Sequence, residues 1–302
     1  MLRSIGVAAA LSGAKGAMRS VCLAALAALC FSSAGPAMAS SLDSEHLFGL
    51  TEGSDIGSAG ERELELEGAF RTGKRGDAYR VFSQASALKL TLTDSFRVSP
   101  LVAIDRHSIR GIPGLTDMNQ WAISEVAFEM KYRALDRQNA PFGLTFALTP
   151  AWGHVDEASG ERTRSYGVSA VALADKELIA NRLLAAFNAG FATGAARVRA
   201  TGVWEHDSAV FASAALSGRV SERVFLSGEF RYERAYDGMG LDRFAGHGLF
   251  AGPAIYVRLS EQAWLSALWN AQIAGKAAGE AGSLDLANFE RHLFKMRLGI
   301  AF

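Results

Sequence analysis

Cysteine is nearly absent from this sequence: Cys22 and Cys30 are the only two among 302 residues. Both lie within residues 1–39, which we expect to be removed from the chain for the reasons given next. The remaining chain then has no thiol. This excludes a disulfide-stabilised scaffold and any metal site built on thiolates, although the compartment would permit disulfides.

The N-terminal stretch has the order of charges expected for a secretory signal peptide. Basic residues precede the apolar run VCLAALAALCF, and small residues follow it up to the tripeptide Ala37-Met38-Ala39. This arrangement predicts cleavage before Ser40. Met18 would give a start of more typical length, and the sequence leaves open which Met is used.

Two alternatives for this stretch are a membrane anchor and a lipoprotein signal. The apolar run is shorter than the ~20 residues that a spanning helix needs. Leu29, before Cys30, is larger than the small residue that precedes a lipoprotein cysteine. Both features favour the cleaved signal peptide.

The charge balance excludes one class of partner. Removing Arg3, Lys15 and Arg19 leaves 28 of the 31 basic residues against all 31 acidic residues, a net charge of −3. A basic surface for nucleic acid is therefore not expected.

Long apolar runs are also absent after Ser40, so no transmembrane helix is predicted. Apolar residues instead recur at every second position, which is the period of a β-strand. The clearest strands are expected at 61–71, 87–93, 96–105, 125–133, 142–152, 225–234, 251–259 and in the ending HLFKMRLGIAF, and weaker ones at 164–173, 183–195, 204–217 and 264–273. Together they predict about twelve strands of the length that crosses a bilayer.

One of the weaker segments, 183–195, also fits a helix. Leu183, Phe187 and Phe191 are four positions apart, so they share a face in either structure. Asn188 and two nearby glycines lower the helix propensity and favour the strand. A helix here would leave ten strands.

Each strong strand has one apolar face and one charged face. In 125–133, Val126 and Phe128 alternate with Glu125, Glu129 and Lys131. A soluble β-sandwich would show the same pattern, with its charges in water. The connections favour a different fold. Short turns, expected at 93–95, 135–140, 174–178, 219–223 and 259–262, alternate with longer loops, expected at 106–118, 154–163, 235–246 and 275–291. This alternation is typical of a transmembrane β-barrel.

Aromatic residues near the strand ends also favour a barrel in a membrane. We assign them to the apolar faces as two interfacial girdles, formed by Phe70, Phe96, Trp121, Tyr132, Phe142, Trp152, Tyr232 and Phe302. A signal peptide without later spanning helices leaves a closed barrel as the structure that crosses a bilayer with its backbone groups paired. The predicted fold is an all-β, antiparallel up-and-down barrel over residues 61–302.

With these features the chain resembles bacterial outer-membrane β-barrel proteins of an uncharacterised, porin-like kind. The ending LGIAF is similar to their C-terminal β-signal, in which a terminal aromatic follows alternating apolar residues. The resemblance implies location in the outer membrane, contact with its lipid and recognition of the last strand by the barrel assembly machinery. It does not by itself identify a function.

The charged faces are expected to line the lumen. The candidate lining residues are Glu63, Glu65, Glu67, Arg71, Lys89, Arg97, Glu125, Glu129, Lys131, Arg133, Glu229, Arg231, Glu233, Arg258, Lys295 and Arg297. Closure places the glutamates of the first strand beside Lys295 and Arg297 of the last. Both signs are present in similar number, so the interior is expected to be a salt-bridge network, a polar pore of weak or mildly cationic selectivity, or both.

Catalytic and cofactor motifs are weak. His107-Ser108 after Asp105 is the nearest approach to a hydrolase cluster, but adjacent strand residues face opposite sides and RHSIRG is expected to be a loop. Glu205-His206-Asp207 is expected at an exposed loop edge. The sequence GHGLFAG lacks the setting of a dinucleotide loop. We assign no catalytic residue, metal or cofactor.

Residues 40–60 precede the first strand and carry glycine, serine and one small apolar cluster. They are expected either to plug the lumen or to form a disordered periplasmic tail. The function predicted from the sequence is a channel for passive diffusion of small hydrophilic solutes. A closed structural barrel and a barrel hydrolase are the alternatives.

Overall fold

The computed structural model describes residues 44–302, and the predicted signal peptide, residues 1–39, lies outside the described residues. Twelve strands follow one another: β1 Arg62–Thr72, β2 Ala78–Thr93, β3 Phe96–Arg110, β4 Met118–Leu135, β5 Gly143–Val155, β6 Arg162–Ile179, β7 Leu183–Val198, β8 Trp204–Arg219, β9 Val224–Asp237, β10 Arg243–Arg258, β11 Ala263–Ala277 and β12 His292–Ala301. Among the described residues no helix is long and apolar enough to cross a membrane.

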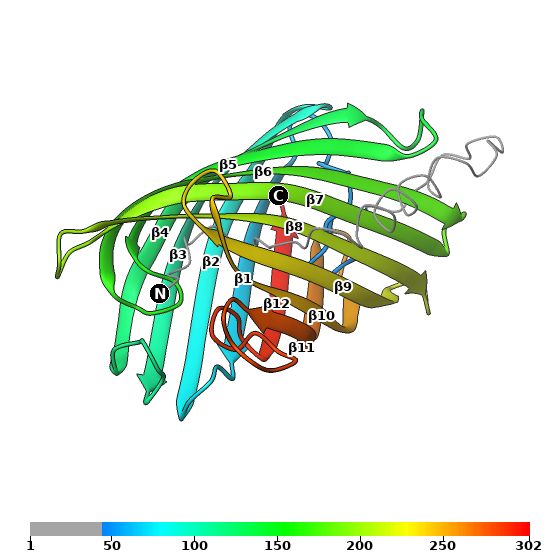
Figure 1. Ribbon diagram of the computed structural model, residues 1–302. Helices are drawn as coiled ribbons and strands as arrows, with labels where there is room; N and C mark the ends of the chain where they lie inside the picture. The colour runs from blue at the N-terminus through cyan, green and yellow to red at the C-terminus, as the bar shows by residue number, and fades with distance from the viewer. Residues whose placement is uncertain (1–43) are drawn as a thin grey trace.

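The strands form a closed antiparallel barrel in which each strand pairs with its neighbours in sequence and β1 pairs with β12 (Figure 1). The predicted fold class and the count of twelve strands are therefore confirmed. Segment 183–195 is part of β7, because it pairs along its length with β6 and β8. The ten-strand alternative is wrong.

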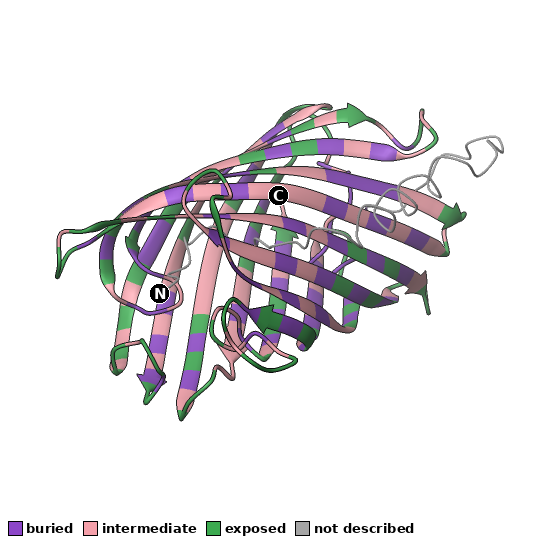
Figure 2. Cartoon of the chain, viewed as in Figure 1, coloured by how far each residue is buried: buried purple, intermediate pink, exposed green. Residues whose placement is uncertain are grey.

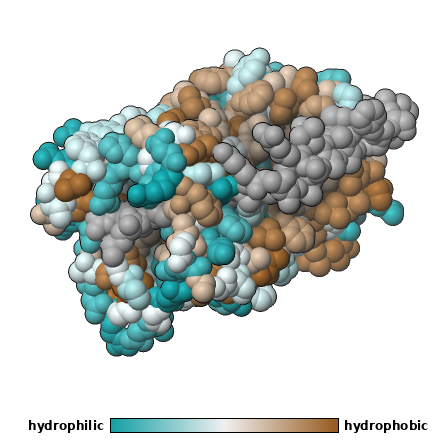
Figure 3. Space-filling view, viewed as in Figure 1, coloured by the Kyte–Doolittle hydropathy of each residue, from teal (hydrophilic) through white to brown (hydrophobic). Residues whose placement is uncertain are grey.

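Burial alternates along the strands, as the period of two predicts (Figure 2). Large apolar side chains such as Leu64, Val126 and Met296 are exposed on the outer face. The space-filling view shows apolar residues gathered over part of the visible wall, with hydrophilic residues toward the loops (Figure 3). In water such a surface would aggregate, whereas in hydrocarbon it is the surface that a spanning barrel requires.

The connections lie at two ends. At the end where β1 begins and β12 finishes, the terminal end, the turns are 94–95, 136–142, 180–182, 220–223 and 259–262. At the other, distal end the loops are 73–77, 111–117, 156–161, 199–203, 238–242 and 278–291. Most distal loops are shorter than predicted because the strands continue further beyond the apolar band.

Several predicted loop residues are therefore strand residues. His107 belongs to β3 and pairs with Val81 and Gln120, so the prediction of a loop at RHSIRG is wrong. Glu205 and its neighbours begin β8, as the predicted strand at 204–217 implies, and do not form the loop edge that we expected at 205–207. The predicted turn at 174–178 is part of β6, since Asp175 pairs with Ala186 and faces the interior. Polar composition is typical of loops and also of strand residues that face the interior, so it does not distinguish the two.

A β-bulge interrupts β4. The register against β3 shifts between Ala103 and Ile104, and the consecutive residues Ser124 and Glu125 are both buried. A bulge places an extra residue on one strand and changes which side chains face inward. Trp121 consequently lies on the outer face, where strict alternation from Val126 would have turned it inward.

Candidate functional site

The interior of the barrel holds a segment that belongs to no strand. We call residues 44–56 the inner segment. All of its residues are buried except Glu52 and Asp55, which are half-buried. Its ends meet: the Ser44 N–H donates to Asp55 Oδ2 at 2.8 Å, and the Asp55 N–H donates to Ser44 Oγ at 3.3 Å. The inner segment is therefore a compact closed loop of the Ω type.

One carboxylate of the wall holds the middle of this loop. Glu229 of β9 is buried and accepts three backbone N–H groups, from Gly49 at 2.5 Å, Leu50 at 3.0 Å and Thr51 at 2.8 Å. Hydrogen bonds to an ionised acceptor are roughly twice as strong as neutral ones. These contacts compensate the buried charge of Glu229 without a cation.

Two more residues of the wall bind the backbone of the inner segment at Glu52 and Ser54. Asp175 of β6 accepts the Ser54 N–H at 2.7 Å and the Ser54 hydroxyl at 3.0 Å. The amide of Asn188 on β7 accepts the Glu52 N–H and donates to the Glu52 carbonyl, both at 2.8 Å. Side chains of the wall thus form the hydrogen bonds that the backbone of the inner segment would otherwise form with a neighbouring strand.

Ion pairs hold the start of the loop. Glu45 forms a bidentate ion pair with Arg97 of β3 and lies 2.8 Å from Lys89 Nζ of β2. Burial opposes ionisation of Glu45, but Arg97 and Lys89 outweigh burial and keep the pKa of this carboxyl well below its usual value. Glu45 is thus an anion docked between two cations of the wall.

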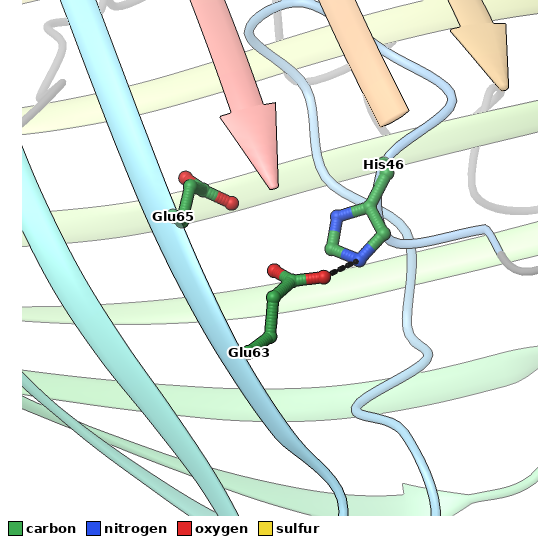
Figure 4. A group of neighbouring side chains, drawn as sticks. All are labelled: His46, Glu63 and Glu65. Atoms are coloured by element: carbon green, nitrogen blue, oxygen red, sulfur yellow. Dashed lines mark ion pairs between the residues drawn. The ribbon is translucent and has the colours of Figure 1, made fainter. Parts of the chain in front are cut away.

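His46 lies beside the glutamates of β1 (Figure 4). Its Nε2 is 3.2 Å from Glu63 Oε2, and its ring stacks on Trp264 of β11 at 4.0 Å between centroids. Ligand atoms of His46, Glu63 and Glu65 lie within 4.8 Å of one another, a spacing that could hold a metal ion. Lys89 Nζ already lies 2.9 Å from Glu63 and 2.6 Å from Glu65, so a metal would have to displace this lysine.

The end of the loop is also ion-paired. Glu52 binds Lys131 of β4, and Asp55 lies 2.6 Å from Arg137 in the turn after β4. Burial raises the pKa of Glu52, but Lys131 and more distant cations lower it to about 2. Every acidic side chain of the inner segment therefore has a basic partner in the barrel.

Apolar residues of the inner segment pack against the wall. Leu47 and Phe48 join a buried cluster with Leu184, Phe225 and Trp264, among others. Leu50 packs in a second cluster that includes residues of β1, β10, β11 and β12. The loop is thus held by hydrophobic contact as well as by charge.

The wall leaves room for the loop because its side chains there are small. Ser213 of β8 contacts the Thr51 hydroxyl at 3.1 Å, Ser227 of β9 lies 3.3 Å from the Leu47 carbonyl, and Thr145 of β5 donates to the Ser54 carbonyl. At Gly49 even a Cβ atom would lie 2.5 Å from the Cβ of Leu268. The inner segment therefore fills space that the strands leave empty.

Loops close over the distal end. Arg231 of β9 lies 2.5 Å from Glu233 and 2.7 Å from Glu290 of the last loop. Glu157 in loop 156–161 lies 2.5 Å from Arg71 of β1. Burial raises the pKa of Glu157 to about 7, because the attraction of Arg71 does not fully offset it.

Closure of the barrel brings the predicted charges of β1 and β12 together. Lys295 lies 2.8 Å from Glu67, and Arg297 lies 2.9 Å from Glu65. Of the other predicted lining residues, those buried inside are Glu63, Lys89, Arg97, Glu125, Lys131, Glu229, Arg231 and Glu233, and those half-buried are Arg71, Glu129 and Arg133. Arg258 has the same parity as the buried Ala254 and Tyr256 but is exposed at the terminal end, where it donates to the Glu222 carbonyl at 3.2 Å, and its place in the lining stays a prediction.

The predicted girdle residues are found on the outer face in two degrees of exposure. Trp121, Tyr132, Trp152 and Phe302 are exposed, whereas Phe70, Phe96, Phe142 and Tyr232 are half-buried among neighbouring side chains. Phe142 lies in a turn, one residue before β5. The girdle itself stays a prediction.

The weak catalytic cluster does not come together as a triad. His107 is fully buried, and its Nε2 lies 2.9 Å from the Glu157 carbonyl oxygen. Asp105 shares its face, while Ser108 lies on the opposite face of β3. Ser108 therefore cannot act as a nucleophile beside His107.

Sequence reasoning found Glu229, Lys89, Arg97 and Lys131 as lining residues but missed other residues that bind the inner segment. Asp175 and Asn188 were assigned to a turn and to a helix or strand, and Asp55, Glu45 and Glu52 were not assigned a role. A usable signal was present: a polar residue at an inward position of a spanning strand needs a partner inside the barrel.

Comparisons with known proteins agree with this architecture. Residues 40–302 match the profile of the Family of unknown function (DUF6662). No curated protein matches the sequence. The COG4313 outer membrane channel from Pseudomonas putida F1 is similar in structure, with a TM-score of 0.54 and 11% identity over 82% of this chain and 98% of that chain. The β domain of the Bordetella autotransporter BrkA gives a TM-score of 0.52 and 13% identity over 81% of this chain and 100% of that chain.

Proposed function

The chain belongs to the Family of unknown function (DUF6662), its fold is that of bacterial outer-membrane β-barrel proteins, and we propose that it is a channel for small hydrophilic solutes gated by its inner segment. One neighbour in structure is itself an outer-membrane channel. That likeness supports the fold, and the argument for a channel comes from the interior of this barrel.

The observation that carries the proposal is the small size of the wall side chains beneath the inner segment. Ser213, Ser227 and Thr145 are buried and each contacts residues 44–56, and Ala186 lies in the buried cluster that holds Leu47 and Phe48. A barrel that serves only as a closed support would fill its lumen with side chains of its own strands. Here a separate loop fills it, so moving that loop opens a polar passage.

The contacts of the loop suit a reversible gate. Carboxylates, amides and basic side chains hold it, and each of these groups is readily hydrated when the loop leaves. The apolar contacts of Leu47, Phe48 and Leu50 favour the docked state. In this proposal the docked loop is the closed state.

Conductance of the reconstituted protein tests the proposal. The chain from Ser40 is compared in planar bilayers with a variant lacking residues 44–56 and with a variant in which a Gly/Ser linker of the same length replaces them. We expect brief or small openings for the unmodified chain and large, steady steps for both variants. Folding of each variant is checked by heat-modifiable migration on a gel.

The outcomes separate the candidate functions. Silent bilayers from variants that have folded would contradict a channel and support a closed structural barrel. Equal, large steps from all three proteins would contradict the gate but not the channel. We assign no catalytic step to the barrel.

A further inference from the structure

A second feature of the interior lies outside the inner segment, in the distal half of the barrel. A cavity is lined there by strands β1 to β5 and by loop 156–161. Its charged lining consists of four carboxylates, Glu67, Asp105, Glu125 and Glu157, and one base, Arg71. The acidic groups outnumber the basic one, in contrast to the balanced charges around the inner segment.

Two of the four carboxylates are already compensated. Glu67 lies 2.8 Å from Lys295, and Glu157 lies 2.5 Å from Arg71. Asp105 and Glu125 form no ion pair within residues 44–302. Both are nevertheless buried, since only 2% of the surface of Asp105 and 6% of the surface of Glu125 is exposed. A buried carboxylate without a partner costs several kcal/mol, so such groups are rare away from functional sites.

Unpartnered polar atoms also point to a ligand. Asp105 Oδ2 and Ser124 Oγ are buried and have no hydrogen-bond partner among the described residues. The bulge in β4 turns both Ser124 and Glu125 inward, next to Ala103 and close to Asp105 on β3. The bulge therefore places the Ser124 hydroxyl beside the two carboxylates that have no ion-pair partner.

The rest of the lining is apolar except for Ser83, whose hydroxyl accepts a hydrogen bond from Arg71 at 3.0 Å. Ala69, Leu101 and Val155 face the same cavity, together with further alanines of β2 and β3. A small inorganic ion would leave this surface without a partner. An organic cation with a short alkyl body matches both parts of the lining.

The geometry points to a binding site for a small organic ammonium ion, with its charged group between Asp105, Glu125 and the Ser124 hydroxyl, and its alkyl part against Leu101 and Val155. This inference rests on the proposed function only in that it names a class of solute for the proposed channel. Binding is measured on the folded barrel in detergent without any conductance, so failure of one proposal leaves the other standing.

Titration with n-butylammonium tests the site, with 1-butanol and sodium as the two partial probes. Isothermal calorimetry is carried out at pH 8 on the chain from Ser40. We expect saturable binding of n-butylammonium, with 1-butanol and sodium each bound at least about tenfold more weakly, a difference of ~1.4 kcal/mol. Equal binding of sodium, or no saturation by n-butylammonium, would overturn the proposal.

Variants locate the binding on the proposed residues. The double variant Asp105→Asn/Glu125→Gln should lose at least about tenfold in affinity and should unfold at a higher temperature, because buried carboxyl groups without an ion-pair partner are replaced by neutral amides. Leu101→Lys keeps both carboxylates and introduces an ammonium group of the protein itself, which should abolish binding of the probe. Glu261→Gln, in an exposed turn, is the matched control and should bind as the unmodified chain does. Unchanged affinity in both cavity variants would refute the site.

Discussion

Glu229, on the wall of the barrel, accepts the backbone N–H of Gly49 at 2.5 Å, 180 residues away in the sequence. The same carboxylate accepts the next two N–H groups of the loop. A single side chain of β9 therefore fixes the position of the innermost turn of residues 44–56.

Replacing Glu229 should release the loop. In Glu229→Gln the acceptor loses its charge, and its amide N–H₂ group faces donors of the backbone. We expect docking to weaken by about 1–3 kcal/mol, the cost of leaving buried donors unsatisfied. Limited proteolysis within residues 44–60 should become at least about tenfold faster. Glu261→Gln is the matched control; equal rates for both variants would show that Glu229 does not hold the loop.

A disulfide should lock the gate. Thr51 Oγ1 and Ser213 Oγ lie 3.1 Å apart, so cysteines at these two positions are close enough to bond after a small rotation. The chain from Ser40 has no cysteine of its own that could interfere. We expect Thr51→Cys/Ser213→Cys to conduct less than the unmodified chain when oxidised and to recover when reduced. Each single variant serves as a control and should not respond to reductant; conductance unaffected by oxidation of the pair would argue against movement of the loop.

Acid should open the gate. The pKa of Glu52 is about 2 and that of Glu45 is well below its usual value, so both stabilise docking above the free carboxyl pKa of ~4.3. This contribution is lost as the pH falls from there toward 2, because the free carboxylate takes up its proton first. Open time in bilayers should therefore rise below about pH 4.

Variants separate this effect from other titrations. Glu52→Gln should open more at neutral pH and should respond less to acid. The pKa of Glu157, about 7, is raised, so this residue favours the folded state at low pH and loses that contribution as the pH rises through 7. Glu157→Gln should consequently keep the opening in acid. An acid response that disappears in Glu157→Gln and persists in Glu52→Gln would reverse this assignment.

The stability of the barrel should depend on the ion pairs between β1 and β12, the strands that close it. Arg297→Glu would place a second buried negative charge beside Glu65, at an expected cost of roughly 3–5 kcal/mol. The temperature of the heat-modifiable gel shift should fall accordingly. Exchange of the two charges in Glu65→Arg/Arg297→Glu should restore part of the loss. If the double variant is as unstable as the sum of the two single variants, the pair does not couple the strands.

The strands could be predicted from the sequence because alternation reports two different environments directly. Val126 and Glu125, for example, are neighbours that face lipid and lumen. Strand ends were less accurate. His107 and Asp175 lie near strand ends, where polar residues follow one another and alternation is no longer visible.

The contacts of the inner segment could not be predicted from the sequence. Residues 44–56 have no periodicity, and their backbone binds side chains of Asp175, Asn188 and Glu229, which come from three different strands. Backbone donors are the same at every residue, so the sequence carries no record of which carboxylate they meet. The bulge at Ser124 could not be predicted either, because a bulge is a shift in strand register and no residue type marks it here.

The meeting of Ser44 with Asp55 has a topological consequence. Because Ser44 and Asp55 lie side by side, residues 44–56 form a loop that returns to its starting point inside the barrel, and no strand of the wall has to part around it. Insertion and withdrawal are then simple translations, free of threading or knotting. The barrel can close first and receive its loop afterwards, and the same path is available in reverse throughout the life of the protein.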